Sequence, residues 1–310
     1  MRIYNGDEWQ PPQHVELVAD IGSIHINPGR EAVTSLSHQI RTDGQERMLW
    51  ITDEAPAYGH EIIESSIFEN KPNWAKGRED SVQGVFFGEL VLGQEFEVPV
   101  AVKPFLTAVS TGAHETAMLL DLESKGLRVY RVLGIAWSIN HGFAMITGFE
   151  EESKSLDNVD WDKGLNEPIG GYLTNLEAIE QVGQSLGLMH ANGIIHGDAG
   201  VKNFAVNGSE VVLTDLAQAR STIREDGYVD EIALQSGMYR DLERFVDDLV
   251  GRGFLSGAND EEWGSFFVNV IAPAYRSGLY KANGERLGES TKLKPIVEQV
   301  IEDISQRYSA

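Results

Sequence analysis

The stretch of chain from Ile194 to Asp215 constrains this sequence more than any other part. It places Asp198, Asn203 and Asp215 in a fixed order, and a short apolar run leads into the last of them. An amide oxygen and a carboxylate can hold Mg²⁺ on phosphate oxygens, and a further aspartate can accept or orient a proton. These are the groups that transfer of a phosphoryl group from a nucleotide requires.

The pattern of apolar residues predicts how the chain enters this stretch. Apolar residues recur at helical spacing over residues 175–189, and Asn192-Gly193 is a turn signal that ends the predicted helix. Ile194 and Ile195 then predict a short buried strand.

A predicted hairpin explains why Asn203 and Asp215 lie apart along the chain. Residues 204–206 and 211–213 are apolar, and Asn207-Gly208 between them favours a turn. Because a hairpin brings its two ends together, Asn203 and Asp215 can face one metal ion.

This segment resembles the protein-kinase-like superfamily. The pattern HGD-x-x-x-x-N that begins at His196 resembles the family's catalytic loop, and residues 214–217 (TDLA) resemble a divergent Asp-Phe-Gly motif. The resemblance implies that Asp198 is the catalytic base or orients the acceptor hydroxyl, and that Asn203 and Asp215 bind Mg²⁺. It also implies that His196 braces the loop by hydrogen bonding.

The resemblance implies an α+β fold with two lobes. A small antiparallel β lobe is expected at residues 78–150, and a larger, mostly helical lobe at residues 151–310. Residues 1–77 would form an N-terminal extension, and nothing in their sequence indicates its role.

A lysine at a strand end is the expected partner of the nucleotide phosphates. The segment 97–103, EVPVAVK, alternates in a way that predicts a strand, and the apolar run 85–92 predicts its neighbour. By the resemblance, Lys103 contacts the α- and β-phosphates of ATP. A carboxylate should hold this lysine, and the candidates are Glu115 and, two helical turns further along, Glu123.

The helix that carries these glutamates is predicted to start near Ser110 or Thr111, because both residue types are favoured caps.

The resemblance assigns two further segments to the nucleotide. Ser81 and Gly84 are the candidates for a phosphate-covering loop, although the glycine spacing there differs from that of the family. Gly148, Phe149 and Glu150 would form a hinge whose backbone binds adenine.

Departures from the family pattern limit the resemblance to part of the family. Gly197 stands where most regulated protein kinases have Arg, and Leu216-Ala217 replaces Phe-Gly. HGD is typical of compact or atypical relatives, which include aminoglycoside phosphotransferases, sugar and lipopolysaccharide kinases, and the small kinase of the KEOPS complex. Lys202 is interpreted either as a catalytic cation that neutralises the γ-phosphate or as a solvated lysine.

Three other features carry alternatives. The polar stretch 155–171 contains Trp161 and is either an acidic lid or a solvated loop. Residues 221–232 are expected to form a short activation or acceptor-binding segment. Asp241 either braces the catalytic loop or is an acid favoured near a helix N-terminus.

Composition limits the partners. The net charge is −23, which disfavours nucleic acid and favours protein segments or small molecules that are cationic or neutral. The absence of cysteine excludes disulfides and thiolate chemistry. The chain shows no signal peptide and no apolar run long enough to cross a membrane, so we expect a soluble protein. The ATP dependence that the resemblance implies indicates the cytoplasm.

The leading hypothesis is an ATP- and Mg²⁺-dependent phosphotransferase that acts on a protein Ser/Thr hydroxyl, including its own. The alternative is a small-molecule kinase of the aminoglycoside or sugar type. A nucleotide-binding pseudokinase that serves as a scaffold is a further alternative.

Overall fold

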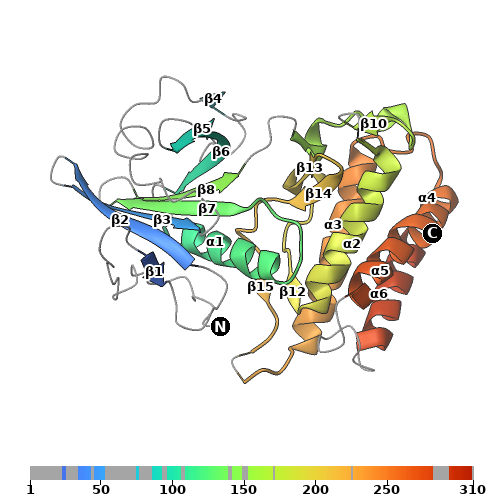
Figure 1. Cartoon of the computed structure of the whole chain (residues 1–310). Helices are drawn as coiled ribbons and strands as arrows, with labels where there is room; N and C mark the ends of the chain where they lie inside the picture. Colours follow the sequence, from blue (N-terminus) through green and yellow to red (C-terminus); the bar gives the residue numbers. More distant parts are fainter. Residues whose placement is uncertain are drawn as a thin grey trace. The chain divides into compact units, whose positions relative to one another are not determined.

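The computed structural model describes part of the chain. The described residues are 23–25, 34–42, 45–52, 75–76, 86–92, 96–105, 109–138, 142–148, 153–169, 172–224, 226–281 and 293–308. The chain divides into two compact units, Met1–Ser124 with Tyr130–Glu151 and Lys125–Val129 with Glu152–Ala310. The first contains an antiparallel sheet and one helix, and the second is mostly helical (Figure 1). The predicted α+β class is therefore confirmed.

The first unit is built on one antiparallel sheet of order β1-β2-β3-β7-β8-β6-β5-β4. Its strands are β1 (Ser23–His25), β2 (Thr34–Thr42), β3 (Gln45–Thr52), β4 (Ala75–Lys76), β5 (Phe86–Leu92), β6 (Phe96–Phe105), β7 (Val132–Ser138) and β8 (Gly142–Gly148). The first four strands lie within residues 1–77, so the expected extension contributes strands to the same sheet as the expected β lobe.

Strand β6 carries the predicted lysine and lies inside the sheet. It pairs with β5 on one side and, from Val100 onward, with β8 on the other. Pro99, which has no N–H to donate, pairs only with β5 and precedes the β8 pairing. The proline therefore removes no hydrogen bond from the β8 side of the strand.

Helix α1 (Val109–Ser124) packs against β6, β7 and β8. It begins earlier than predicted, so Ser110 and Thr111 lie in its first turn rather than outside it. First-turn N–H groups need no partner within the helix, so these residue types are tolerated there as well as at the cap.

The second unit contains the predicted helices and hairpin. Its elements are β9 (Lys154–Ser155), η2 (Leu156–Asn158), η3 (Trp161–Lys163), β10 (Pro168–Ile169), β11 (Leu173–Thr174), α2 (Asn175–Ala191), β12 (Ile194–Ile195), η4 (Val201–Asn203), β13 (Phe204–Asn207), β14 (Glu210–Leu213), β15 (Arg220–Ser221), α3 (Glu231–Gly251), α4 (Asp260–Phe266), the π-helical turn η5 (Phe267–Ile271), α5 (Ala272–Lys281) and α6 (Leu293–Arg307). None of the described helices is long and apolar enough to cross a membrane.

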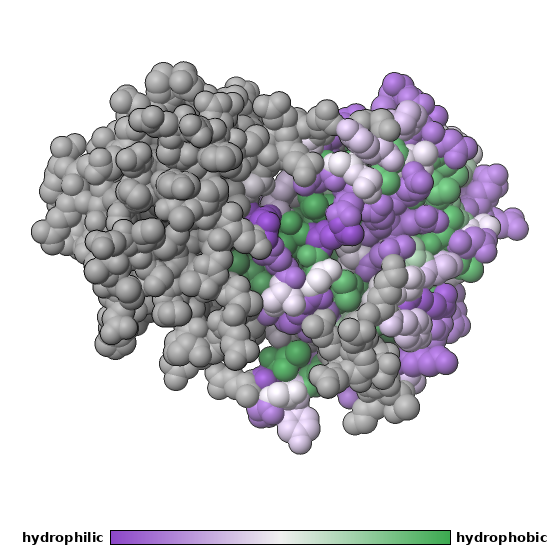
Figure 2. Space-filling model, viewed as in Figure 1, coloured by the Kyte–Doolittle hydropathy of each residue, from purple (hydrophilic) through white to green (hydrophobic). Residues whose placement is uncertain are grey.

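Helix α2 is the central element of this unit. Thr174 and Glu177 form a reciprocal capping box at its start, and Asn192 follows its last turn as predicted. Most of its apolar residues are almost fully buried, because it packs against α5, the β13–β14 hairpin and α3. Polar side chains cover much of the surface of the helical unit on the face shown in Figure 2.

Trp161 belongs to the core of this unit. Its side chain is 2% exposed, its Nε1–H donates to the Leu156 carbonyl at 3.2 Å, and its ring meets Phe254 edge-on at 5.8 Å. Phe254 also contacts Trp263 and Phe266. Neither of the two alternatives, an acidic lid or a solvated loop, predicted the burial of Trp161, because its neighbours in the sequence are polar.

Helices α2 and α5 approach so closely that their contact requires glycine. A Cβ on Gly278 would lie 1.9 Å from the Gln184 carbonyl oxygen, and one on Gly187 would lie 2.1 Å from the Tyr275 carbonyl oxygen. Both clashes are with backbone, which cannot move aside as a flexible side chain can.

We predict that Gly278→Ala lowers the free energy of unfolding by about 3 kcal/mol, since overpacking at a helix contact forces the two backbones apart. Gly251→Ala is the matched control, because its Cβ would meet nothing within 4 Å. Alanine there is expected to be neutral or stabilising by about 0.5 kcal/mol. Urea unfolding followed by circular dichroism measures both. Equal effects of the two substitutions would contradict the close approach.

Candidate active site

The loop that begins at His196 is held by a buried carboxylate. Asp241, on α3, is 2% exposed and accepts hydrogen bonds from the backbone N–H of His196 at 2.6 Å and of Gly197 at 2.9 Å. The ring of His190 lies 3.0 Å from the same carboxylate. Asp241 therefore braces the loop, as one of the two alternatives predicted. The other is wrong, because Asp241 lies in the middle of α3 rather than near its first residue, Glu231.

The charge of Asp241 is favoured by these contacts. Burial raises the pKa of its carboxyl, but the hydrogen bond and charge of His190 and the backbone N–H of His196 outweigh burial and lower the pKa below 3.8. Hydrogen bonds to a charged acceptor contribute about 1.5–3 kcal/mol each. The loop backbone is thus fixed by an ionised group at neutral pH.

Gly197 has a conformation that explains its presence in the loop. Its φ is 84°, in the left-handed region that glycine adopts readily, and a Cβ there would lie 2.7 Å from the Gln218 carbonyl oxygen. An arginine at this position would be strained and would clash. The backbone conformation of this loop therefore requires glycine at position 197.

His196 is buried without a side-chain hydrogen bond among the described residues. Neither ring nitrogen has a partner, and the ring packs beside Phe204 with centroids 5.8 Å apart. Burial lowers the pKa of His196 below 6.5, against the opposing charges of Asp241, Asp198 and Asp215. The expected bracing of the loop by a hydrogen bond of His196 is found at its backbone N–H, which donates to Asp241.

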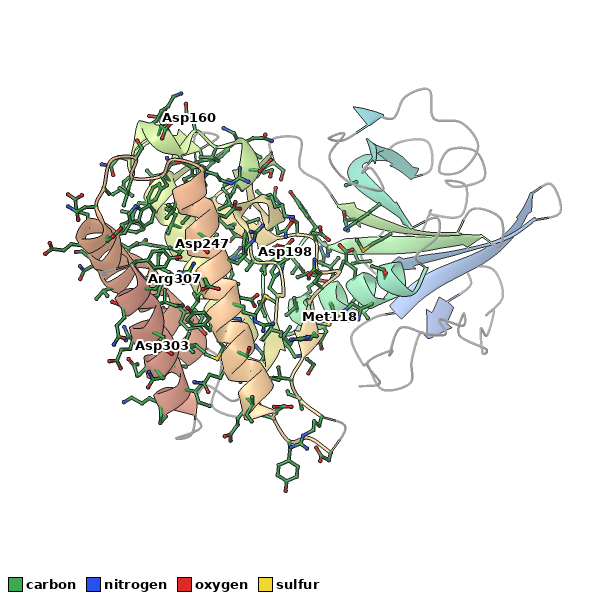
Figure 3. All side chains as sticks on the ribbon, turned by 180° about the vertical axis from the view of Figure 1, so that it is seen from behind. Met118, Asp160, Asp198, Asp247, Asp303 and Arg307 are labelled. Carbon is green, nitrogen blue, oxygen red and sulfur yellow. The ribbon has the colours of Figure 1, made fainter. Side chains whose placement is uncertain are left out.

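Asp198 lies between two cations. Lys202 Nζ is 3.0 Å from its Oδ2, and Arg244 Nε is 3.5 Å from its Oδ1 (Figure 3 labels Asp198). The amide of Asn203 donates to Oδ2 at 3.1 Å and to the Asp198 carbonyl at 2.6 Å. Burial raises the pKa of Asp198, but these cations and the amide together lower it below 3.8. An ionised carboxylate of low basicity suits orientation of a hydroxyl better than early removal of its proton.

The hairpin brings Asn203 and the strand before Asp215 together, as predicted. The N–H of Thr214 donates to the Asn203 carbonyl at 2.9 Å and extends the β13–β14 ladder to the residue before Asp215. Asp215 is exposed and has a φ of 51°, an uncommon conformation for a residue other than glycine. Such conformations cluster at functional sites.

These two residues have the donor chemistry that suits Mg²⁺. The Asn203 amide nitrogen is fixed by its two hydrogen bonds to Asp198, which leaves the side-chain oxygen Oδ1 for a ligand. Asp215 adds a carboxylate. No group of three or more His, Cys, Asp and Glu side chains that could hold a metal occurs in the described part of the chain. Mg²⁺ commonly takes one or two protein ligands and completes its shell with phosphate and water oxygens.

Two residues that the sequence reasoning missed support the loop from α3. Asp248 accepts the N–H of Val201 at 2.7 Å, and Arg244 contacts Asp198. Arg252 links Asp248 at 3.4 Å to Asp157 at 2.5 Å. The spacing of Asp241, Arg244 and Asp248 puts three polar groups on one helical face, which is the signal that could have found them.

Lys103 and Glu115 form an ion pair within the sheet unit. Lys103 Nζ is 2.9 Å from both carboxylate oxygens of Glu115, which is 2% exposed. Glu123 instead pairs with Arg131 at 3.6 Å. Of the two carboxylates weighed for Lys103, the contact is thus with Glu115.

The remaining site predictions lie mostly outside the described residues. Ser81, Gly84, Phe149 and Glu150 belong to this group. Gly148 ends β8, and its N–H donates to the Arg131 carbonyl at 2.9 Å, so that N–H is already used within the sheet unit.

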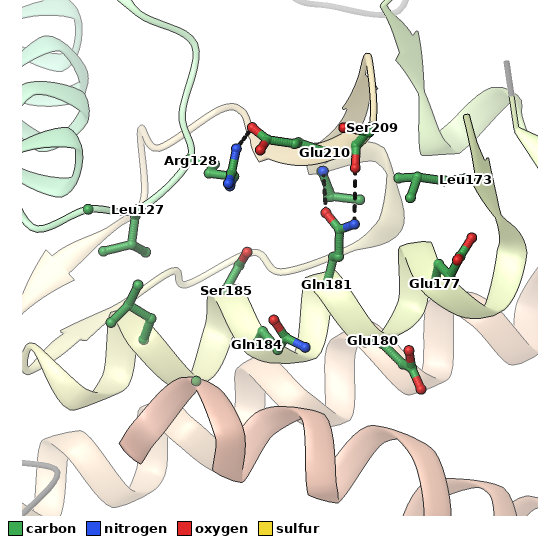
Figure 4. Close-up of a pocket in the computed structure, with 14 residues that line it drawn as sticks. Leu127, Arg128, Leu173, Glu177, Glu180, Gln181, Gln184, Ser185, Ser209 and Glu210 are labelled. Carbon is green, nitrogen blue, oxygen red and sulfur yellow. Dashed lines mark hydrogen bonds and ion pairs between the residues drawn. The ribbon is translucent and has the colours of Figure 1, made fainter. Parts of the chain in front are cut away.

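A pocket of about 460 Å³ opens beside α2, and none of the candidate residues lines it (Figure 4). Gln181 spans it by accepting from the Val211 N–H at 2.8 Å and donating to the Ser209 carbonyl at 3.2 Å. Of its acidic residues, Glu210 pairs with Arg128, and Glu177 caps α2. Gln181 thus attaches the hairpin to α2. The pocket is separate from the loop of Asp198.

Comparisons with known proteins identify no family. No protein-family model matches the chain, and no curated protein matches it. Among solved structures, the chain is similar to one described as "WaaP in complex with acyl carrier protein". The identity is 13%, the TM-score is 0.42, and the match covers 76% of this chain and 88% of that one. A similarity of this size carries no information about activity, so the function rests on the chain's own residues.

We predict that His196 makes the protein less stable in mild acid. Its pKa is lowered in the folded state, so below pH 6.5 the unfolded state binds more protons and unfolding is favoured. Between pH 7.5 and 5.5 this loss amounts to at most about 1.4 kcal/mol. Urea unfolding at the two pH values measures it. His196→Gln should lose less stability over this interval than the wild type, and an equal loss would contradict a buried neutral His196.

Proposed function

We propose that this chain is an ATP- and Mg²⁺-dependent phosphotransferase of the protein-kinase-like type, which transfers the γ-phosphate of ATP to a hydroxyl group. The observation that carries the proposal is the arrangement at the loop after β12. An ionised Asp198 is fixed by Lys202 and Asn203, and the hairpin returns the chain to Asp215 beside the same loop. Few structural roles require these four residues together.

The chemistry follows from these side chains. Asp198 accepts a hydrogen bond from the acceptor hydroxyl and orients its oxygen for in-line attack on the γ-phosphorus. A new oxygen–phosphorus bond forms as the bond to the β–γ bridging oxygen breaks. ADP leaves with the electron pair of the broken bond, and the hydroxyl proton passes to Asp198 and then to water.

The developing negative charge needs cations. Asn203 and Asp215 would hold Mg²⁺, which would neutralise part of this charge. Lys202 is half-exposed and would turn from Asp198 toward the γ-phosphate. Lys103, held by Glu115, is assigned to the α- and β-phosphates. In water-excluded sites such electrostatic stabilisation is the largest catalytic contribution.

For the acceptor, we propose a protein Ser/Thr hydroxyl. Support comes from the segment that runs from β15 into the first turn of α3, where large apolar side chains are exposed: Ile223 at 37%, Tyr228 at 70% and Ile232 at 82%. Exposed apolar groups of this kind suit contact with a polypeptide. Thr222, by contrast, is buried and its hydroxyl donates to the Gly193 carbonyl at 2.8 Å, so it is a poor site of self-modification.

A small-molecule acceptor is the alternative. The observation that favours it is the tightness of the same segment. Arg224 N–H donates to the Tyr228 carbonyl, and Asp230 N–H donates to the Thr222 carbonyl, each at 2.8 Å. A short turn closed in this way offers a polypeptide limited surface. A scaffold without catalysis would not require Lys103, Asp198, Asn203 and Asp215 together.

We predict that Asp198→Ala abolishes transfer of label from [γ-³²P]ATP and Mg²⁺ to the protein itself or to an added acceptor. The loss should be at least about 100-fold, because orientation and general-base assistance contribute 10²–10⁴-fold. The assay uses a panel of proteins, aminoglycosides and sugars, which also separates the two acceptor classes.

Asp303→Ala is the control, because Asp303 is an exposed α6 residue and its loss changes the charge equally. This variant should label as the wild type does. Undiminished labelling by Asp198→Ala would overturn the assignment of Asp198. A thermal melt of each variant shows that the fold is retained.

A further inference from the structure

We propose that Arg244 binds an anionic group, a phosphate or a carboxylate, that lies next to the hydroxyl of the acceptor. The inference rests on the proposed function and deepens it, because it names a chemical feature of the acceptor. For a protein acceptor, this feature is an acidic or phosphorylated residue beside the Ser or Thr.

Arg244 lies at the carboxylate of Asp198, the group that is proposed to orient the acceptor hydroxyl. Its Nε lies 3.5 Å from Asp198 Oδ1, whereas Lys202 lies 3.0 Å from the other oxygen, Oδ2. Lys202, on η4, and Arg244, on α3, therefore contact different oxygens of Asp198. If Lys202 serves the γ-phosphate, Arg244 is the cation left for the acceptor.

The guanidinium of Arg244 has donors to spare. Asp198 is its only ionic or hydrogen-bond partner among the described residues, and the contact, at 3.5 Å, is longer than a good charge-assisted hydrogen bond. The side chain is 51% exposed. A guanidinium presents five N–H donors in a planar fork that matches phosphate and carboxylate oxygens in pairs. A surface ion pair of this kind contributes little to stability, so a purely structural role explains Arg244 poorly.

The loop backbone lies directly against this guanidinium. Gly200 lies beneath it, and a Cβ there would be 3.5 Å from Arg244 Nε and 3.1 Å from the Asp248 carboxylate. Asp248 is itself bound to the Val201 N–H and lies 3.4 Å from Arg252. Arg244, on α3, therefore lies over a loop that is held in place by hydrogen bonds.

Local and overall charge act over different distances. The net charge of −23 repels anions during approach, but at physiological salt this field is screened beyond about 8 Å. Within that distance Arg244 and Lys202 are two cations that face the carboxylate of Asp198. The acceptor can therefore be neutral or cationic overall and still carry one anionic group that Arg244 recognises.

The test measures binding of inorganic phosphate to the full chain. Thermal melts follow a titration in which sodium phosphate replaces sodium chloride at constant ionic strength, first alone and then with a saturating Mg²⁺-bound, non-hydrolysable ATP analogue. The analogue fills the γ-phosphate position, so the remaining phosphate binding reports the acceptor side. Binding to the folded state raises the melting temperature and gives the affinity.

We expect Arg244→Gln to weaken phosphate binding by about tenfold, which corresponds to one lost charge-assisted pair. Arg240→Gln is the matched control, since Arg240 is an exposed arginine on the same helix with no contact to Asp198. It should change the affinity by less than about twofold, in keeping with the small effect of exposed charges.

The outcomes separate the inference from the proposed function. Failure of the Mg²⁺-bound analogue to raise the wild-type melting temperature counts against the phosphotransferase. A normal rise with the analogue, but phosphate affinity that is absent or unchanged in Arg244→Gln, overturns the role of Arg244 alone. Equal weakening by Arg240→Gln overturns it too, because the effect would then be general electrostatics.

Discussion

A buried carboxylate, that of Asp241, fixes the loop on which the candidate chemistry depends. It accepts the N–H groups of His196 and Gly197 and contacts the ring of His190, so it joins α3, α2 and the loop at one point. An ionised group this deeply buried is stable only when its hydrogen bonds are made. Asp198 lies two residues after His196, so these hydrogen bonds also fix its position. Asp248 adds a second attachment at Val201.

The two cations beside Asp198 help to lower the pKa of its carboxyl and also orient it. An ionised carboxylate between Lys202 and Arg244 is held in one orientation, and the two cations are partly exposed and can turn to anionic ligands. Lys202 is then assigned to the phosphoryl donor and Arg244 to the acceptor. This division gives each of the two cations a separate role, and it places two positive charges at Asp198 in a chain whose net charge is −23.

Local sequence signals predicted the elements of the helical unit better than its contacts. The turn after α2 and the β13–β14 hairpin follow from Asn-Gly pairs, whose effect is confined to a few residues. The role of Asp241 was left open, because its hydrogen bond to His196 N–H spans 45 residues. The polar spacing on α3 could have singled out Arg244, but its partner Asp198 follows only from the packing of α3 on the loop. The burial of Trp161 likewise depends on Phe254, far along the chain.

The most direct test of the account is calorimetric titration of ATP with and without Mg²⁺, in the wild type and in Asp215→Asn. Asn203 and Asp215 are claimed to hold one Mg²⁺ on the phosphates, so Mg²⁺ should tighten ATP binding to the wild type by about tenfold or more. The variant keeps the size of the side chain but loses its charge, and this dependence on Mg²⁺ should largely disappear. A dependence on Mg²⁺ that is the same in both proteins, or no binding of ATP to the wild type, would contradict the account.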